Sequence, residues 1–179
     1  MKTRQVSEIA IIIALTAVFE IIFSNLGITL FPNGGSISLA VLPLMILTVR
    51  YGFVTGLVAA SIFGIFQFIL PYPVYFLTPL QYVFDYILPY VAIPFVVVFG
   101  KKSTQLVVGG IIVFVLKYLS HVIAGVVYWG EYAPEGFSAW TWSLWYNATY
   151  SVPSVILSVL VLYLIATRYP QLLAANVDQ

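Results

Sequence analysis

Long apolar runs, separated by short polar or proline-containing stretches, dominate this chain. A transmembrane helix needs about 20 mainly apolar residues, and Pro, Gly and polar clusters mark where such helices end. Dividing the chain at these breaks gives six segments, at residues 6–24, 38–50, 52–70, 79–99, 105–129 and 138–167. The pattern predicts an all-α membrane protein, a bundle of six transmembrane helices forming one domain over residues 1–179.

The second segment is the least regular of the six. It is short for a membrane span and contains Pro43, so we expect a helix that is kinked or that begins earlier. The preceding stretch, residues 26–35, is rich in Asn, Pro and Gly and is predicted to be a loop. Proline also marks later segments, because the third ends at Pro71 and the fourth contains Pro89 and Pro94.

Composition supports the membrane assignment and removes several kinds of chemistry. The chain has 62% hydrophobic and 7% charged residues, with a mean hydropathy of +1.06, whereas soluble domains carry about 25% charged residues. The absence of Cys excludes disulfides and Cys nucleophiles, and a single His leaves little room for a transition-metal site. We therefore expect neither a metal nor a cofactor. The pattern GxxxxGK followed by Ser or Thr is absent, so ATP would have to be bound by a partner.

The basic residues indicate the orientation. Six of the seven Lys and Arg residues fall on one side of the predicted membrane, namely Lys2, Arg4, Arg50, Lys101, Lys102 and Arg168. The loops on the other side contain Glu131 and Glu135 but neither Lys nor Arg. By the positive-inside rule, we expect both termini to be cytoplasmic. We also expect the protein to reside in a bacterial plasma membrane.

Four ionisable side chains lie within the apolar segments, and each needs a partner or a function because a charge at the bilayer centre costs about 2.5–3.5 kcal/mol. They are Glu20, Asp85, Lys117 and His121. One interpretation is structural: Lys117 pairs with Asp85 and His121 bonds to a neighbouring helix. The other is that Lys117 and His121 belong to the wall of a binding site.

The fifth segment favours the binding site. Lys117, His121, Gly125 and Trp129 recur every four residues, so they form one stripe along a helix. The stripe leads from a buried charge to an aromatic side chain near the outer surface. Gly125 is expected to leave room for a ligand ring to approach the backbone.

The sixth and fourth segments offer matching faces. Trp142, Tyr146 and Tyr150 share a helical stripe, with Ser143 and Asn147 beside them. An interfacial aromatic belt explains Trp140 and Trp145 but requires no amide such as Asn147. Gln81 and Asp85 are four residues apart on the fourth segment. A carboxylate among aromatic faces and an amide suits a flat, cationic, hydrogen-bonding solute.

The first segment carries a different signal. Ala10 and Ala14 form a pair of small residues four positions apart, which lets another helix pack closely in lipid. Packing within the same chain and docking of a partner both explain this pair.

Five motifs carry a resemblance to a known family. They are SEIAIIIALTAVF at 7–19, GGSISLAVLP at 34–43, QYVFDY at 81–86, KYLSHVIAGVVYWGEYAPEG at 117–136 and WSLWYN at 142–147. In order and spacing they resemble the thiamine-specific substrate-binding subunits (S components) of energy-coupling factor transporters. The similarity covers nearly the whole chain.

The resemblance implies a six-helix bundle that takes up thiamine from outside, is not an enzyme, and works with a membrane scaffold subunit and two cytoplasmic ATPases. It implies ligand contacts at Asp85, Tyr86, His121, Gly125, Trp129, Trp142 and Asn147, to which the stripes add Lys117 and Tyr146. It also implies that Ala10 and Ala14 dock on the scaffold. Some family members have a Trp in the first outer loop; here that aromatic wall is either missing or supplied by Phe31 or Tyr75. We expect lipid and these proteins as partners, and no nucleic acid.

Three alternatives remain from the sequence. In the first, the protein has the same role but its ligand is a thiamine precursor or another vitamin, since the pyrimidine half of thiamine fits the same carboxylate and Trp. An intramembrane enzyme would use Asp85, His121 and Lys117 for proton transfer, but it lacks an obvious nucleophile or metal set. A purely structural subunit would leave Asn147 and Asp85 unexplained.

Overall fold

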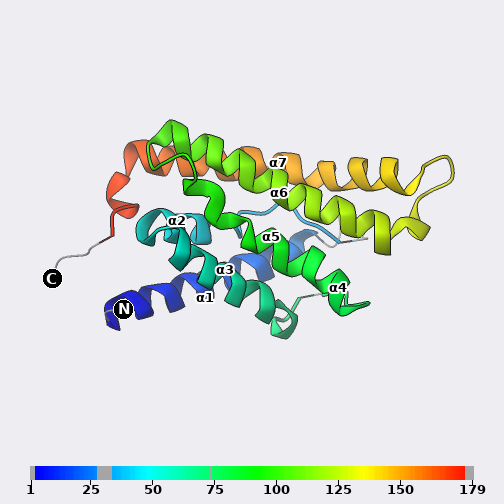
Figure 1. Ribbon diagram of the computed structural model, residues 1–179, viewed down its shortest axis with the longest axis horizontal. Coiled ribbons are helices and arrows are strands. Elements are labelled where there is room, and N and C mark those ends of the chain that lie inside the picture. The colour runs from blue at the N-terminus through cyan, green and yellow to red at the C-terminus, as the bar shows by residue number, and fades with distance from the viewer. Residues whose placement is uncertain (1–2, 28–33, 73, 176–179) are drawn as a thin grey trace.

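The structure, a computed structural model, describes residues 3–27, 34–72 and 74–175, and every regular element within them is helical. Six helical segments run side by side along the long axis of the molecule (Figure 1). They are α1 (Thr3–Gly27); α2 (Leu42–Tyr51); α3 (Phe53–Phe66) with the 3-10 turn η1 (Gln67–Ile69); the run α4 (Pro79–Tyr82), η2 (Val83–Ile87), α5 (Leu88–Val91) and η3 (Ile93–Val97); α6 (Ser103–Tyr128); and α7 (Ala139–Arg168). The all-helical, six-segment prediction is confirmed.

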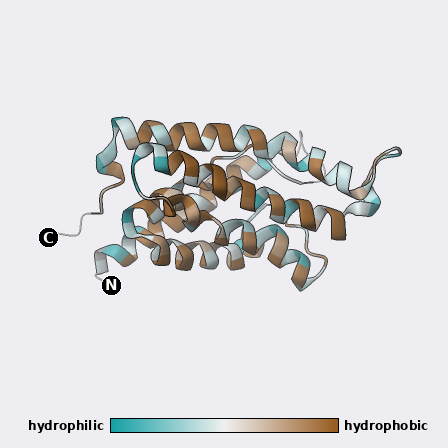
Figure 2. Cartoon of the chain, turned by 45° about the horizontal axis from the view of Figure 1, so that its top comes forward, coloured by the Kyte–Doolittle hydropathy of each residue, from teal (hydrophilic) through white to brown (hydrophobic). Residues whose placement is uncertain are grey.

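Four of these segments are long and apolar enough to cross a membrane, which makes the chain a multi-pass membrane protein. They are Gln5–Leu26, Pro79–Val97, Ser103–Tyr128 and Ala139–Arg168. Most of the length of the helices is hydrophobic, and hydrophilic residues are more frequent towards their ends (Figure 2). Many large apolar side chains are exposed, among them Ile11, Val54 and Val127. That distribution is expected for a bundle whose sides face lipid.

The second segment differs from the prediction. The helix begins at Leu42, with Pro43 in its first turn, where a missing N–H costs nothing. Residues 35–39 are not helical, so neither a helix from residue 38 nor an earlier start is correct. Hydrogen bonds explain how the chain remains extended there: the Ser38 amide donates to Ser154 Oγ of α7 at 3.0 Å. The predicted loop at 26–35 lies mostly outside the described residues.

The core forms around α2, the shortest of the six helical segments. Leu44, Met45 and Leu47 of α2 are fully buried. They share one apolar cluster with Ile93 of η3 and Leu162 of α7. In contrast, Thr16 is the one buried side chain among those described in α1. Helix α1 therefore lies at the edge of the bundle, with Ile9, Ile12 and Ile13 packed against the core and its other face exposed.

The start of α1 and the end of α7 lie at the same end of the bundle as the α2–α3 junction and the start of α6 (Figure 1). Arg50, in the last turn of α2, connects α2 to α1 and to the segment after α7 at this end. Its guanidinium donates to Glu8 of α1 at 2.8 Å and to the Leu172 carbonyl after α7 at 2.8 Å. Of the predicted cytoplasmic basic residues, Lys2 lies outside the described residues.

Candidate functional site

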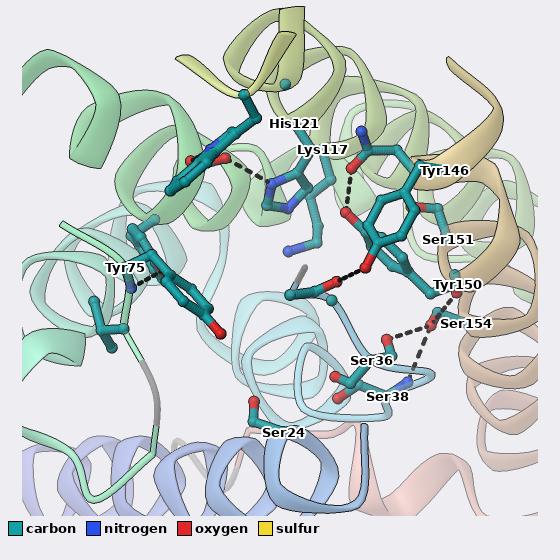
Figure 3. A pocket seen from close by; sticks show the side chains of 18 of the residues that line it. Ser24, Ser36, Ser38, Tyr75, Lys117, His121, Tyr146, Tyr150, Ser151 and Ser154 are labelled. Carbon is teal, nitrogen blue, oxygen red and sulfur yellow. Dashed lines mark hydrogen bonds and ion pairs between the residues drawn. The ribbon is translucent and has the colours of Figure 1, made fainter. Parts of the chain in front are cut away.

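A cavity of about 660 Å³ opens between the helices, within the range of small-molecule sites. Its wall comes from α1, the extended segment that starts at Gly34, the turn η1 with the connection after it (residues 72 and 74–77), the η2–α5 run, α6 and α7. Tyr132 of the 3-10 turn η4 (Gly130–Tyr132) completes it. In Figure 3, Lys117 and His121 of α6 point into it across from Tyr75, and Tyr146 and Tyr150 of α7 close one side. All nine side chains or backbones predicted to contact a ligand line this cavity, namely Asp85, Tyr86, Lys117, His121, Gly125, Trp129, Trp142, Tyr146 and Asn147.

Polar contacts in the cavity converge on the Asp85 carboxylate. Gln81 Nε2 donates to its Oδ2 at 2.6 Å, and Trp129 Nε1 donates to the same oxygen at 3.3 Å. His121 Nδ1 lies 3.5 Å from Oδ1. Side chains from two elements thus hold a carboxylate at the cavity wall, and its remaining lone pairs are available to a ligand.

The predicted pairing of Lys117 with Asp85 is wrong. Lys117 Nζ lies 4.7 Å from the centre of the Tyr90 ring, in a cation–π arrangement. Asp85 is instead the neighbour of His121, one turn further along α6. The His121 half of that structural interpretation is therefore correct, since its ring does meet a side chain of a neighbouring helical segment.

A π-helical turn, η2, positions Asp85. At its end the Leu88 amide donates to the Val83 carbonyl five residues earlier, and Pro89 has no N–H to offer the carbonyls of the turn. Side chains of neighbouring segments donate hydrogen bonds to these carbonyls instead. Ser120 Oγ of α6 donates to the Phe84 carbonyl at 2.6 Å, and Gln67 Nε2 donates to the Tyr86 carbonyl at 3.0 Å. Such single π-turns recur at functional sites.

Gly125 has a second role that the sequence did not reveal. A Cβ at this position would lie 2.2 Å from Ser143 Oγ and 3.1 Å from Ser143 Cβ. Ser143 is held there because its hydroxyl donates to the Val122 carbonyl at 2.9 Å. The space predicted for a ligand ring is thus largely taken by α7, although Gly125 still forms part of the wall.

The α7 face of the cavity is linked to the extended segment. Asn147 donates to the Ser143 carbonyl at 2.9 Å and accepts from the Tyr150 hydroxyl. Tyr146 donates to the Gly34 carbonyl at 2.9 Å. Gly35 has φ +95°, and a Cβ there would lie 2.5 Å from the Tyr150 ring, so only glycine lets the chain pass so close.

Two other aromatic predictions concern the rim. Trp140 and Trp145 are each 56% exposed, and neither lines the cavity, as the interfacial-belt interpretation requires. Tyr75, one of the two candidates for the missing Trp of the first outer loop, lines the cavity and meets Trp129 edge-to-face, with ring centres 6.0 Å apart. Phe31 lies outside the described residues.

The cavity contains residues that the sequence did not assign to it. Glu20 of α1 accepts from the Tyr90 hydroxyl at 2.5 Å and from Ser24 Oγ at 3.1 Å. Tyr72, in the turn after η1, donates to Gln67 at 2.7 Å, and burial raises the pKa of its hydroxyl, which stays protonated. The position of Glu20 inside an apolar helix is a sequence signal that it has a function or a partner. Tyr72 and Tyr90 carry no comparable signal in the sequence.

The predicted docking pair lies away from the cavity. Ala10 and Ala14 are exposed on α1 and do not line the cavity wall. Packing of this pair inside the chain, one of the two interpretations of the sequence, therefore does not occur within the described structure. Nor do the described residues include a group of three or more His, Asp or Glu side chains that could hold a metal ion.

Comparisons with known proteins agree with this architecture. The sequence model of a family described as thiamine transporter protein matches residues 6–174. The chain is 33% identical to the thiamine transporter ThiT of Bacillus subtilis (strain 168), over 94% of this chain and 93% of that protein. It is 29% identical to the thiamine transporter ThiT of Lacticaseibacillus paracasei (strain ATCC 334), over 91% and 89%. A solved structure of ThiT from Listeria monocytogenes superimposes with a TM-score of 0.73 at 26% identity, covering 92% of this chain and 98% of that one.

Proposed function

The chain belongs to the thiamine transporter protein family, and we propose that it binds thiamine in the cavity and delivers it across the membrane as the S component of an energy-coupling factor transporter. The observation that carries the proposal is the Asp85 carboxylate, held at the wall of a cavity rich in aromatic rings. The protein is thus a transport protein and not an enzyme.

The chemistry of thiamine fits this wall. Thiamine joins a flat aminopyrimidine, which donates and accepts hydrogen bonds, to a thiazolium ring that carries a positive charge. Asp85 offers the pyrimidine amino group a charge-assisted acceptor. Trp129 and Tyr75 offer aromatic faces to a cation, an interaction of about 2 kcal/mol when desolvated. Asn147 and Tyr146 stand on the opposite side, on α7.

The test is to identify and titrate the ligand. Native mass spectrometry of the purified protein should show thiamine travelling with it, and a thiamine precursor or another vitamin in its place would redirect the proposal. Thiamine should quench Trp fluorescence, because stacking alters indole emission. In Trp129→Ala we expect a large loss of both affinity and quenching. Trp140→Ala, at an exposed position outside the cavity, is the matched control and should bind normally.

The partner part of the proposal rests on α1. This helix lies outside the core with Ala10 and Ala14 exposed, and small residues permit close approach of another helix. We expect this surface to receive the scaffold subunit, while two ATPases supply the energy from the cytoplasmic side of the plasma membrane.

Docking is tested by enlarging the small residues. Ala10→Trp or Ala14→Trp should bind thiamine normally when purified alone, fail to co-purify with scaffold and ATPases, and abolish uptake by cells. Val54→Trp, on the exposed surface of α3, adds similar bulk elsewhere and should assemble normally. Weak thiamine binding by the isolated alanine variants would place the pair inside the fold, and normal uptake would place the docking surface elsewhere.

A further inference from the structure

Glu20 is a second carboxylate in the cavity wall, supplied by a helix that otherwise contributes only Ser24. Its two oxygens accept from the hydroxyls of Tyr90 and Ser24, and both donors are uncharged. Within the described part of the chain, Glu20 makes no ion pair within 4 Å. The Lys117 ammonium lies over the ring of the same Tyr90 and offsets part of this negative charge without forming a direct ion pair with it.

The formal charge of the cavity depends on this residue. Its ionisable lining consists of Glu20, Asp85, Lys117 and His121, apart from tyrosines. With a neutral imidazole, two carboxylates and one ammonium leave a net charge of −1. Without Glu20 the sum is zero. This difference of one charge has a large effect on the interaction energy with a charged ligand, because Coulomb energies rise as the dielectric constant of the surroundings falls.

Glu20 and Asp85 act on different parts of the cavity. Asp85 is held by Gln81 and Trp129, whereas Glu20 is held by Tyr90, five residues beyond Asp85 on the same helical run. At about 1.5 Å per residue, this offset amounts to roughly 7 Å along the helix. The two carboxylates share no hydrogen-bond donor. One elongated ligand can therefore meet each of them with a different group.

We infer that Glu20 is the specificity-determining residue for the positive charge of the ligand. This inference rests on the proposed function. Asp85 takes the hydrogen-bonding pyrimidine, and Glu20 faces the thiazolium end and supplies the excess negative charge that favours a cation over a neutral molecule of the same shape.

The experiment compares thiamine with a neutral analogue in which a thiophene ring replaces the thiazolium. Calorimetric Kd values for both ligands are measured on the parent, Glu20→Gln and Glu135→Gln. The parent should prefer thiamine. Glu20→Gln should lose about tenfold or more in thiamine affinity while its affinity for the neutral analogue changes little. Glu135→Gln removes an equal charge from an exposed site outside the cavity and should keep the preference.

The outcomes separate the two claims. A parent that binds thiamine and the neutral analogue equally well overturns the inference without any variant. Equal losses for both ligands in Glu20→Gln would make Glu20 a structural residue and also overturn it. Tyr90→Phe, which keeps the carboxylate but removes its hydroxyl partner, should retain the preference for the cation. A parent that binds neither ligand would instead refute the proposed thiamine function.

Discussion

At the scale of single residues, Asp85 shows how a carboxylate is kept usable in a membrane. Its Oδ2 accepts from Gln81 and Trp129, and its Oδ1 lies near His121. These donors reduce the cost of desolvating the charge. The carboxylate has further acceptor capacity and lines the cavity, so a ligand donor would add to a set of hydrogen bonds that is already organised.

Replacing Asp85 by Asn retains the shape and removes the charge. We expect thiamine binding to weaken by about 1.5–3 kcal/mol, the scale of hydrogen bonds to charged groups. Asp85→Glu should be tolerated or even improve binding, because it keeps the charge. Calorimetric titration measures both. Parent-like affinity in Asp85→Asn would show that the ligand does not use this carboxylate.

Much of the site could be predicted because polar residues at helical spacing in apolar segments must face inward. That reasoning identified the stripe from Lys117 to Trp129. It could not show which helices face each other. Charge alone therefore suggests Lys117 as a partner of Asp85 in one of the two interpretations, whereas in the structure His121 lies beside Asp85 and Lys117 lies over Tyr90. For the same reason Glu20 was not assigned to the cavity.

At the scale of elements, the π-turn η2 depends on hydrogen bonds from outside its own helix. Removing the Ser120 hydroxyl would leave the Phe84 carbonyl without that donor, which costs about 1–3 kcal/mol when the group stays buried. We expect Ser120→Ala to lower thermal stability and, through a shift of Asp85, thiamine affinity. Ser7→Ala removes an exposed hydroxyl of α1 and should change neither. Unchanged affinity in a destabilised Ser120→Ala would show that η2 does not position Asp85.

Close contact of α6 with α7 is tested at Gly125. In Gly125→Ala the new Cβ meets Ser143 Oγ, so we expect lower thermal stability and weaker thiamine binding. In the double variant with Ser143→Ala, the nearest atom becomes Ser143 Cβ, 3.1 Å away in place of 2.2 Å, and part of the stability should return. A single variant as stable as the parent would mean that α7 moves aside at little cost.

Helix ends were well predicted from proline and polar breaks, except in the second segment. Residues 35–39 are apolar enough to continue α2, and hydropathy cannot distinguish an extended apolar chain from a helix. The bond from the Ser38 amide to Ser154, more than a hundred residues away in sequence, stabilises the extended form. Contacts of that range are not visible in a local pattern.

At the scale of the whole molecule, the orientation is open to a direct test because the chain has no Cys. Glu135→Cys, in the exposed α6–α7 connection, and Lys101→Cys, in the exposed turn before α6, introduce single thiols at opposite ends. A membrane-impermeant maleimide should label the first in intact cells and the second only after permeabilisation. The Cys-free parent is the control. The reverse pattern would place the termini outside.

The extended segment before α2 also accounts for the room inside the bundle. It runs along the bundle towards α2, in the place of the other half of a helix (Figure 1). Ten residues of α2 cover about 15 Å, half the thickness of a bilayer core. A helical cylinder of that length and about 10 Å diameter occupies roughly 1,200 Å³, and an extended chain needs fewer than half as many residues over the same length.

The difference, roughly 600 Å³, is close to the cavity volume of about 660 Å³. The room that the extended backbone leaves is thus of the same size as the binding space, which small residues such as Gly35 and Gly125 also line. Side chains of the lining other than Gly35 and Gly125 can then be exchanged without closing the cavity, so one scaffold of this shape can bind differently shaped ligands while its lipid-facing surface stays the same.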